Sequence, residues 1–597
     1  MKPLNMRFKI NFIVISTWLM TLSAHSIGPQ NASSTSLAPD LFPLSQYADT
    51  AALFPMPTCG SFQLEEASID QMQEAMANGS LTSQQLVACY ITRTYQTNSY
   101  INTLLQLNPD VLAIAAQMDN ERTAGRVRGP LHGIPFTVKD NIATKDNLET
   151  TAGSWALLGS VVPRDAFVVN QLREAGAVLF GKATLSEWAD MRSNSYSEGY
   201  SGRGGQARSA YNLTSSPGGS SSGSAAGVAA NAIAFSLGTE TDGSVINPAE
   251  RNAIVGIKPT VGLTSRSGVI PESEHQDTVG TFGRTVRDAT YALDAIYGID
   301  PRDNYTLAQN ENTPDGGYSR FIANKTSLEG AVFGLPWKSF WIHADSEQQE
   351  VLISILDLIQ SAGATIVNET EILDYENLVS NDGWNWDWGT ARGYSNESEY
   401  TVVAVDFYNN IQSYLSELNN TDIKTFEDIV NFNYANDGSE GGYPYPDEGG
   451  IPAFASGQDG FLASLATGGI RNETYWQALS FCQGKTRDGI DWALKGGEQT
   501  IPGGKAKLDG LLVPPDVGQS YQIAAQAGYP VITIPAGVHS EDGMPFGLAI
   551  MQTAWAEEEL VKWASAIEDL QHTTDGWVHK RTLPEWRSYL RRNIPIL

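Results

Sequence analysis

Three short segments hold the hydroxyl, amine and small side chains that nucleophilic catalysis requires. Lys139 lies in GPLHGIPFTVKDNI at residues 129–142, residues 216–227 read SPGGSSSGSAAG, and TETDGS follows at residues 239–244. A serine hydroxyl attacks a carbonyl carbon only if a base accepts its proton, and the departing amine then needs a proton donor. Serines beside a lysine that burial keeps neutral would supply both functions. Residues of these types could therefore activate a serine for attack on a carbonyl carbon, if the fold brings them together.

The glycine- and serine-rich segment 216–227 has two simpler interpretations. Its composition is that of a flexible linker, but the Ala-rich residues 224–235 that follow predict a helix packed inside a domain. Residues 219–223 also fit the G-x-S-x-G elbow of Ser-His-Asp hydrolases. Residues 210–217 make a poor buried strand in front of such an elbow. The elbow hypothesis stays as an alternative, with these candidate histidines: His275, His343, His539, and His572 or His579.

A third interpretation uses more of the chain. The three segments, together with GKATLSEWADMRS at 181–193 and AGYPVITIPAG at 527–537, resemble the amidase signature family. That family uses a serine–serine–lysine triad without histidine. The resemblance implies that Lys139 is the base, Ser220 the relay serine and Ser244 the nucleophile. It covers roughly residues 65–570, and the chain looks most like the branch that contains bacterial peptide amidase and fungal amidases.

The same resemblance assigns an oxyanion hole. It would consist of the backbone N–H groups of Thr241, Asp242, Gly243 and Ser244. This chain departs from the common family form T-D-x-G-G-S-I-R by carrying Glu240, Asp242 and Ile246. An ionised carboxylate that pointed into the oxyanion hole would oppose the developing negative charge. We therefore expect the two acidic side chains to face away or to hydrogen-bond elsewhere.

Other residues near the triad receive supporting roles from the resemblance. The peptide bond between Gly219 and Ser220 would be cis, and Ser221 would support the lysine. Burial and hydrogen bonding must lower the lysine pKa from its usual value near ~10.4. Arg203 and Gln206 are candidate supporting or substrate contacts.

Apolar runs and helical patterns alternate along most of the chain. The predicted strands are 133–138, 177–180, 332–335, 511–514 and 530–535, and helical patterns occur at 168–176 and 559–570. Capping boxes predict two helices that begin at Ser68 and Thr82. This alternation predicts an α/β fold with a central mixed β-sheet flanked by helices, and the resemblance implies that it is the amidase signature fold. Residues from about 370 to 500 are rich in Trp, Tyr, Asp and Gly and predict an irregular inserted lobe beside the substrate cleft.

The N-terminus predicts export from the cell. Lys2, Arg7 and Lys9 precede the apolar residues 10–24, so residues 1–26 are predicted to be a signal peptide, with a retained anchor as the alternative. Residues 27–65 would form an N-terminal extension and residues 66–597 the amidase domain. Nine N-x-S/T sequons suggest N-linked glycans, at Asn31, Asn78, Asn212, Asn304, Asn324, Asn368, Asn396, Asn419 and Asn472. We expect a secreted, extracellular glycoprotein.

Charge and cysteine content exclude other classes of protein. The chain has 38 Lys and Arg against 67 Asp and Glu, a net charge of −29, which disfavours nucleic acid and anionic membranes as partners. This acidity argues against the tRNA amidotransferase role found in the family. Three cysteines permit at most one disulfide. Cys89 has helical spacing to Leu86 and Tyr90 and is expected to be a buried thiol, which leaves Cys59–Cys482 as the expected pair.

The metal motifs C-x-x-C and H-E-x-x-H are absent, so we expect no metal site. The serine–serine–lysine chemistry that the resemblance implies needs no cofactor, so we expect an enzyme without one. We expect a secreted amidase that hydrolyses a small amide or a C-terminal peptide amide through an acyl-serine intermediate. The alternatives are a Ser-His-Asp esterase or other hydrolase, and a secreted glycoprotein that retains the fold without catalysis.

Overall fold

A computed structural model of the chain describes residues 54–446, 448–588 and 595–596. The predicted signal peptide, residues 1–26, lies outside the described residues, as do residues 27–53 of the predicted extension. Within the described part of that extension, Cys59 and Leu64 are buried in the hydrophobic core.

The described residues contain thirteen strands and seventeen α-helices. The strands are β1 Leu104–Leu107, β2 Pro135–Lys139, β3 Val178–Ala183, β4 Tyr200–Ser201, β5 Gly205–Gln206, β6 Phe235–Glu240, β7 Val255–Lys258, β8 Thr278–Gly283, β9 Val332–Leu335, β10 Thr365–Asn368, β11 Gly510–Val513, β12 Val531–Val538 and β13 Pro545–Met551. The helices are α1 Ile69–Ala77, α2 Ser83–Ile101, α3 Val111–Thr123, α4 Phe167–Glu174, α5 Ser222–Ala229, α6 Ile246–Glu250, α7 Val286–Ile296, α8 Ser346–Ser361, α9 Tyr375–Leu378, α10 Trp388–Ala391, α11 Glu399–Glu417, α12 Phe426–Ala435, α13 Asp437–Glu440, α14 Asp459–Ala466, α15 Glu473–Leu494, α16 Gly518–Ala527 and α17 Glu557–Thr573.

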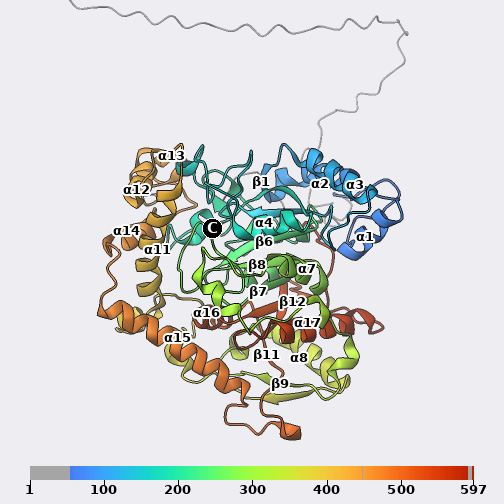
Figure 1. The fold of residues 1–597 in the computed structure, drawn as a ribbon. Helices are drawn as coiled ribbons and strands as arrows, with labels where there is room; N and C mark the ends of the chain where they lie inside the picture. The colour runs from blue at the N-terminus through green and yellow to red at the C-terminus, as the bar shows by residue number, and fades with distance from the viewer. Residues whose placement is uncertain (1–53, 447, 589–594, 597) are drawn as a thin grey trace, which may run out of the picture. The chain divides into compact units, whose positions relative to one another are not determined.

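One mixed sheet of eleven strands runs through the described domain (Figure 1). Its order is β1-β3-β2-β6-β8-β7-β12-β13-β11-β9-β10. Strand β2 pairs in parallel with both β3 and β6, whereas β8, β7, β12 and β13 pair antiparallel with their neighbours. Helices lie around this sheet and cover its apolar residues, which form two large buried clusters. The predicted α/β fold with a central mixed sheet is confirmed.

Local sequence signals determine several helix boundaries. Ser68 and Thr82 form the predicted capping boxes at the starts of α1 and α2. The prediction of one helix over residues 224–235 is wrong at its C-terminal end, because α5 ends at Ala229 and Phe235 already begins the buried strand β6. Alanine and isoleucine in a fully buried segment suit either structure, so composition did not locate the boundary.

The inserted lobe lies between β10 and β11 in the sequence. It contains the helices α9 to α15, so the segment predicted as irregular is built largely of helices. In Figure 1, α11, α12, α13 and α14 stand together on one side of the sheet, away from α1, α2 and α3. Helix α11 packs against α14 and α15 and carries Glu399 toward the pocket described below.

The disulfide joins Cys59 to Cys89, so the predicted Cys59–Cys482 pair and the predicted free thiol at Cys89 are both wrong. Residue Cys89 lies on α2, and Cys59 Sγ lies 3.4 Å from the carbonyl oxygen of Gln85 one turn earlier on that helix. The N-terminal segment therefore packs directly on α2. Cys482 is a free, buried thiol on α15 of the inserted lobe.

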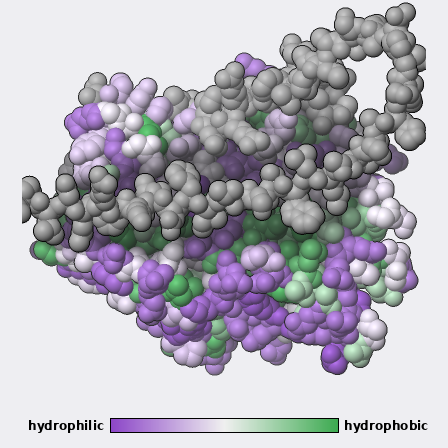
Figure 2. Space-filling view, turned by 90° about the horizontal axis from the view of Figure 1, so that it is seen from above, coloured by the Kyte–Doolittle hydropathy of each residue, from purple (hydrophilic) through white to green (hydrophobic). Residues whose placement is uncertain are grey.

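Much of the visible surface is polar. In the lower part of the face shown in Figure 2, hydrophilic residues predominate and hydrophobic residues are scattered. Among the described helices, none has both the length and the apolar composition needed to cross a membrane.

Candidate active site

The sheet brings the three predicted catalytic residues to one edge. Lys139 is the last residue of β2, and Ser244 follows the end of the adjacent strand β6. Because β2 and β6 are parallel, their carboxyl ends lie side by side. Ser220 lies just before α5, which packs against both strands.

A continuous chain of hydrogen bonds joins the three side chains. Lys139 Nζ donates to Ser220 Oγ at 2.7 Å, and Ser220 Oγ donates to Ser244 Oγ at 2.8 Å. Lys139 and Ser220 are 0% exposed and Ser244 is 5% exposed. The peptide bond between Gly219 and Ser220 is cis. This arrangement can pass a proton from Ser244 through Ser220 to the lysine if the lysine is neutral.

Burial allows a measurable fraction of Lys139 to be neutral at physiological pH. It lowers the pKa of Lys139 from 10.5 to about 8, although nearby carboxyl groups, Glu272 first, oppose the shift. At pH 7 roughly one lysine in ten is then neutral, because the pKa lies about one unit higher. Lys139 can therefore act as a base, which a surface lysine could not do at this pH.

Thr239 is a further site residue that sequence reasoning missed. Lys139 Nζ donates to the Thr239 hydroxyl at 2.9 Å and to its carbonyl oxygen at 3.2 Å. Ser221, which was predicted to support the lysine, instead donates to the Thr239 carbonyl at 3.1 Å and so acts through Thr239. Asn141 also donates to the Thr239 hydroxyl at 2.9 Å. The sequence did offer a signal for this role. Thr239 lies five residues before Ser244, near the end of β6, and that end of β6 lies beside the end of β2 that carries Lys139.

Two glycines allow close approaches around the serines. A Cβ on Gly219 would lie 1.7 Å from Glu198 Oε2, so only glycine fits between that carboxyl group and the relay serine. Gly243 has a φ of +82°, and a Cβ there would lie 2.7 Å from the Tyr521 ring. The glycine-rich segment is thus tightly packed, which excludes the linker interpretation.

The predicted oxyanion residues Thr241, Asp242, Gly243 and Ser244 all line one pocket, which encloses about 550 Å³ of space partly open to solvent. The Thr241 carbonyl accepts a hydrogen bond from Gln276 Nε2, and the Gly243 carbonyl accepts one from the Asn247 N–H. In a planar trans peptide the following N–H points the opposite way. These bonds therefore fix the directions of the Asp242 and Ser244 N–H groups.

Glu240 and Asp242, the two acidic residues that differ from the common family form, have different surroundings. Glu240 is fully buried and accepts the N–H groups of Val245 and Ile246 at 2.7 and 2.9 Å, so it faces the start of α6 and not the pocket. Asp242 lines the pocket and accepts a hydrogen bond from Trp384 Nε1 of the lobe. Burial, and then the neighbouring Glu399, raise the pKa of Asp242 well above its ordinary value. A raised pKa favours the neutral carboxylic acid, which opposes an oxyanion less than a carboxylate would.

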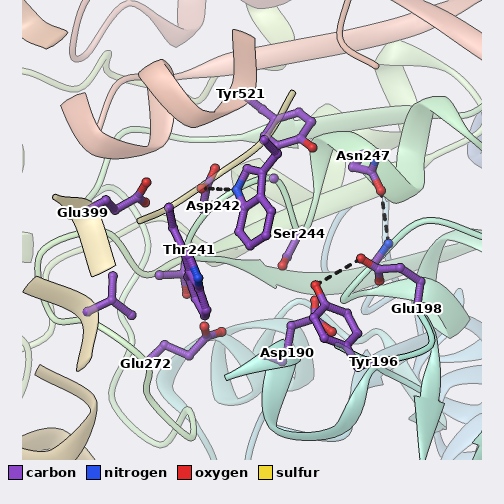
Figure 3. A pocket seen from close by; sticks show the side chains of 16 residues that line it. Asp190, Tyr196, Glu198, Thr241, Asp242, Ser244, Asn247, Glu272, Glu399 and Tyr521 are labelled. Atoms are coloured by element: carbon purple, nitrogen blue, oxygen red, sulfur yellow. Dashed lines mark hydrogen bonds between the residues drawn. The ribbon is translucent and has the colours of Figure 1, made fainter. Parts of the chain in front are cut away.

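Five carboxyl groups line the pocket: Asp190, Glu198, Asp242, Glu272 and Glu399. Figure 3 shows Asp190 and Glu198 with Tyr196 on one side of Ser244, and Asp242 with Glu399 on the other. Burial raises the pKa of each of these carboxyl groups. The pocket is therefore less negatively charged than its composition suggests.

The alternative Ser-His-Asp arrangement does not fit the described site. No histidine lines the pocket around Ser244. His275 Nδ1 lies 2.7 Å from Asp406 Oδ2, but Ser273 donates to that same oxygen at 2.7 Å and not to the histidine. A catalytic triad needs the serine hydroxyl bonded to the imidazole.

Other candidate contacts lie outside the pocket. Arg203 Nη1 lies 3.6 Å from Asp140 Oδ2, and Gln206 donates to the carbonyl oxygens of Glu198 and Ala207, so neither lines the pocket. Two groups of described residues have spacing that could hold a metal ion, and neither includes a triad residue: Glu274, His275 and Asp406, and Asp345, Asp516 and His539.

Comparison with known proteins agrees with this fold. The Amidase family profile matches residues 85–439, and the chain belongs to this family, whose members with the amidase signature fold include peptide amidase. The protein is an amidase, a hydrolase acting on amides.

Individual relatives cover nearly all of the chain. It is 58% identical over 556 residues to "Putative amidase C869.01" of Schizosaccharomyces pombe, covering 92% of each chain. Native peptide amidase from Stenotrophomonas maltophilia superposes with a TM-score of 0.73 at 34% identity, covering 88% of this chain and 99% of that one. The peptide amidase PAM in complex with the competitive inhibitor chymostatin gives a TM-score of 0.72 at 34% identity, covering 87% of this chain and 99% of the other.

Proposed function

We propose that the protein is a secreted amidase that hydrolyses a carboxylic amide through an acyl-Ser244 intermediate. The observation that carries the proposal is the buried chain of hydrogen bonds from Ser244 through Ser220 to Lys139. Neutral Lys139 accepts a proton from Ser220 while Ser220 accepts the proton of Ser244. The Ser244 oxygen then attacks the amide carbon, and the N–H groups of residues 241–244 stabilise the oxyanion.

The same three residues then return the proton to the leaving group and hydrolyse the acyl-enzyme. Protonated Lys139 returns the proton through Ser220 to the nitrogen of the tetrahedral intermediate, so the C–N bond breaks and ammonia or an amine departs. A water molecule then attacks the acyl-Ser244 ester, with Ser220 and Lys139 again accepting the proton. The products are a carboxylic acid and a regenerated serine.

The substrate we propose is a small amide or the C-terminal amide of a peptide. Likeness to the peptide amidase of S. maltophilia supports the second choice. The pocket supports a substrate with an apolar acyl part, since Trp384, Trp386 and Val403 are among the residues that line it.

The decisive experiment follows ammonia release from simple primary amides and amidated peptides, with mass spectrometry to detect an acyl group on Ser244. Lys139→Ala should abolish release while the thermal unfolding midpoint shows that the fold persists. Full activity of that variant, or no cleavage of any amide by the wild type, would refute the proposal.

Export and glycosylation are part of the proposal. They are supported by the N-terminal residues 1–26 and by the surface positions of six sequons: Asn78, Asn304, Asn324, Asn368, Asn419 and Asn472. Asn212 is buried, and its Nδ2 donates to the Asp542 carbonyl at 3.0 Å, so it should carry no glycan. Sequencing the N-terminus of protein recovered from the medium, with glycan mapping, tests both points.

A further inference from the structure

The relay mechanism determines where the leaving group must lie. Ser220 is the group that returns the proton to the departing nitrogen, so that nitrogen must lie on the Ser220 side of Ser244. The preceding residue, Gly219, lines the pocket and marks this side. The residues that surround Gly219 therefore meet the leaving group, provided the proposed function holds.

Two carboxyl groups and a phenol occupy this side of the pocket (Figure 3). Glu198 lies directly against Gly219, since a methyl group added to that glycine would come within 1.7 Å of Glu198 Oε2. The same carboxyl group accepts hydrogen bonds from Ser186 Oγ at 3.1 Å and from Tyr196 Oη at 3.4 Å. Asp190 lines the pocket beside it, and its Oδ1 is buried with no hydrogen-bond partner among the described residues.

The backbone holds Asp190 in place. Trp188, Ala189 and Asp190 have φ values of +52°, +54° and +84°, three successive left-handed residues that are not glycine. Such a conformation is uncommon for residues with a Cβ and persists where the surrounding structure enforces it. The Ser186 N–H also donates to the Ser220 carbonyl at 3.0 Å, which ties this segment to the relay serine.

These two carboxyl groups match the hydrogen-bonding demand of an unsubstituted amide. The nitrogen of a primary amide carries two N–H donors, and each needs an acceptor when it is buried. An N-alkyl amide loses one donor and places carbon against a carboxyl group, and an ester has no donor at all. Burial raises the pKa of both carboxyl groups, and the nearby Glu198 raises that of Asp190 further, so the pair retains acceptor oxygens without a full double negative charge.

We propose that Asp190 and Glu198 form the leaving-group subsite of this amidase and select unsubstituted carboxamides by accepting their two N–H groups. The proposal rests on the proposed function and deepens it. In this proposal Asp190 and Glu198 bind the amide nitrogen, and the proton relay remains with Ser220 and Lys139.

The test uses three substrates with one acyl group: a primary amide, its N-methylamide and its methyl ester. For each, kcat/KM is measured with wild type, Asp190→Ala, Glu198→Ala and the control Asp294→Ala, whose carboxyl group binds the Tyr318 and Ser319 N–H groups outside the pocket. Asp190→Ala should lower kcat/KM for the primary amide by about 10- to 100-fold, because alanine has no acceptor atom and this is the range for losing one hydrogen bond to a charged or strongly polar partner. The ester value should fall by less than about 3-fold, because an ester makes no such bond.

The outcomes separate the two proposals. If the wild type cleaves none of the substrates, the proposed function fails and the subsite fails with it. If the wild type is active but Asp190→Ala lowers the amide and ester values equally, or leaves both unchanged, the subsite alone is refuted. If thermal unfolding shows that Asp190→Ala is not folded, the ratio of the amide to the ester kcat/KM of Glu198→Ala decides instead.

Discussion

The pH dependence of catalysis tests the central chemical claim, that a buried lysine is the base. The perturbation is a change of pH from 6 to 10 with an uncharged amide as substrate. Burial lowers the pKa of Lys139 to about 8, and only the neutral amine accepts a proton. The neutral fraction is about one tenth at pH 7 and about nine tenths at pH 9, so kcat/KM should rise roughly tenfold over this interval and then level off.

A lysine with its ordinary pKa of 10.5 would give a different curve. Its neutral fraction at pH 7 is roughly one in 3,000, and activity would still be rising about tenfold per pH unit at pH 9. The assay is initial-rate ammonia release in a constant-ionic-strength buffer series, with enzyme stability checked at each pH. A rise centred near the histidine value of about 6.5, or a rate independent of pH between 7 and 9, would refute the assignment of Lys139 as the base.

Three further predictions concern the nucleophile, the packing and the disulfide. Ser244→Ala should lower kcat for amides by about 10⁴-fold or more, as for other covalent serine hydrolases, with an unchanged unfolding midpoint. Gly219→Ala should destabilise the protein by about 1–3 kcal/mol and abolish activity, because the new methyl group overlaps the Glu198 carboxyl group, and urea unfolding with ammonia release measures both effects. Removing the Cys59–Cys89 bridge should cost about 3–4 kcal/mol of unfolding free energy, since it closes a loop of 30 residues, and urea unfolding of a double serine variant measures this.

Matched controls distinguish these effects from general damage. Gly484→Ala adds a methyl group where nothing lies within 4 Å, in the middle of α15, so it should leave activity unchanged and stabilise the helix by about 0.5–1 kcal/mol. Cys482→Ser removes the free thiol and should leave the disulfide intact by non-reducing mass analysis. A normal kcat for Gly219→Ala would contradict the packing described here, and loss of the disulfide in Cys482→Ser would contradict the pairing.

The inserted lobe shows where sequence patterns reach their limit. Its Trp- and Asp-rich composition predicted a lobe near the cleft, but not that Trp384 donates to Asp242, 142 residues away in the sequence. The predicted cysteine pairing was also wrong because it depended on contacts between segments far apart in the sequence. Helical spacing placed Cys89 on the apolar face of α2, yet whether the N-terminal segment or the lobe docks beside it depends on tertiary packing.

The sequence by itself determined the chemical groups of the site and the alternation of strands and helices, because residue type and short-range spacing are local properties. It identified Lys139, Ser220 and Ser244, and it placed the lysine at the end of an apolar strand. Only the tertiary structure decided that Thr239 holds the lysine, that Glu240 faces away from the pocket while Asp242 lines it, and that Asp190 and Glu198 meet beside the relay serine. Those contacts depend on the pairing of β2 with β6 and on the docking of loops and lobe, which no local pattern encodes.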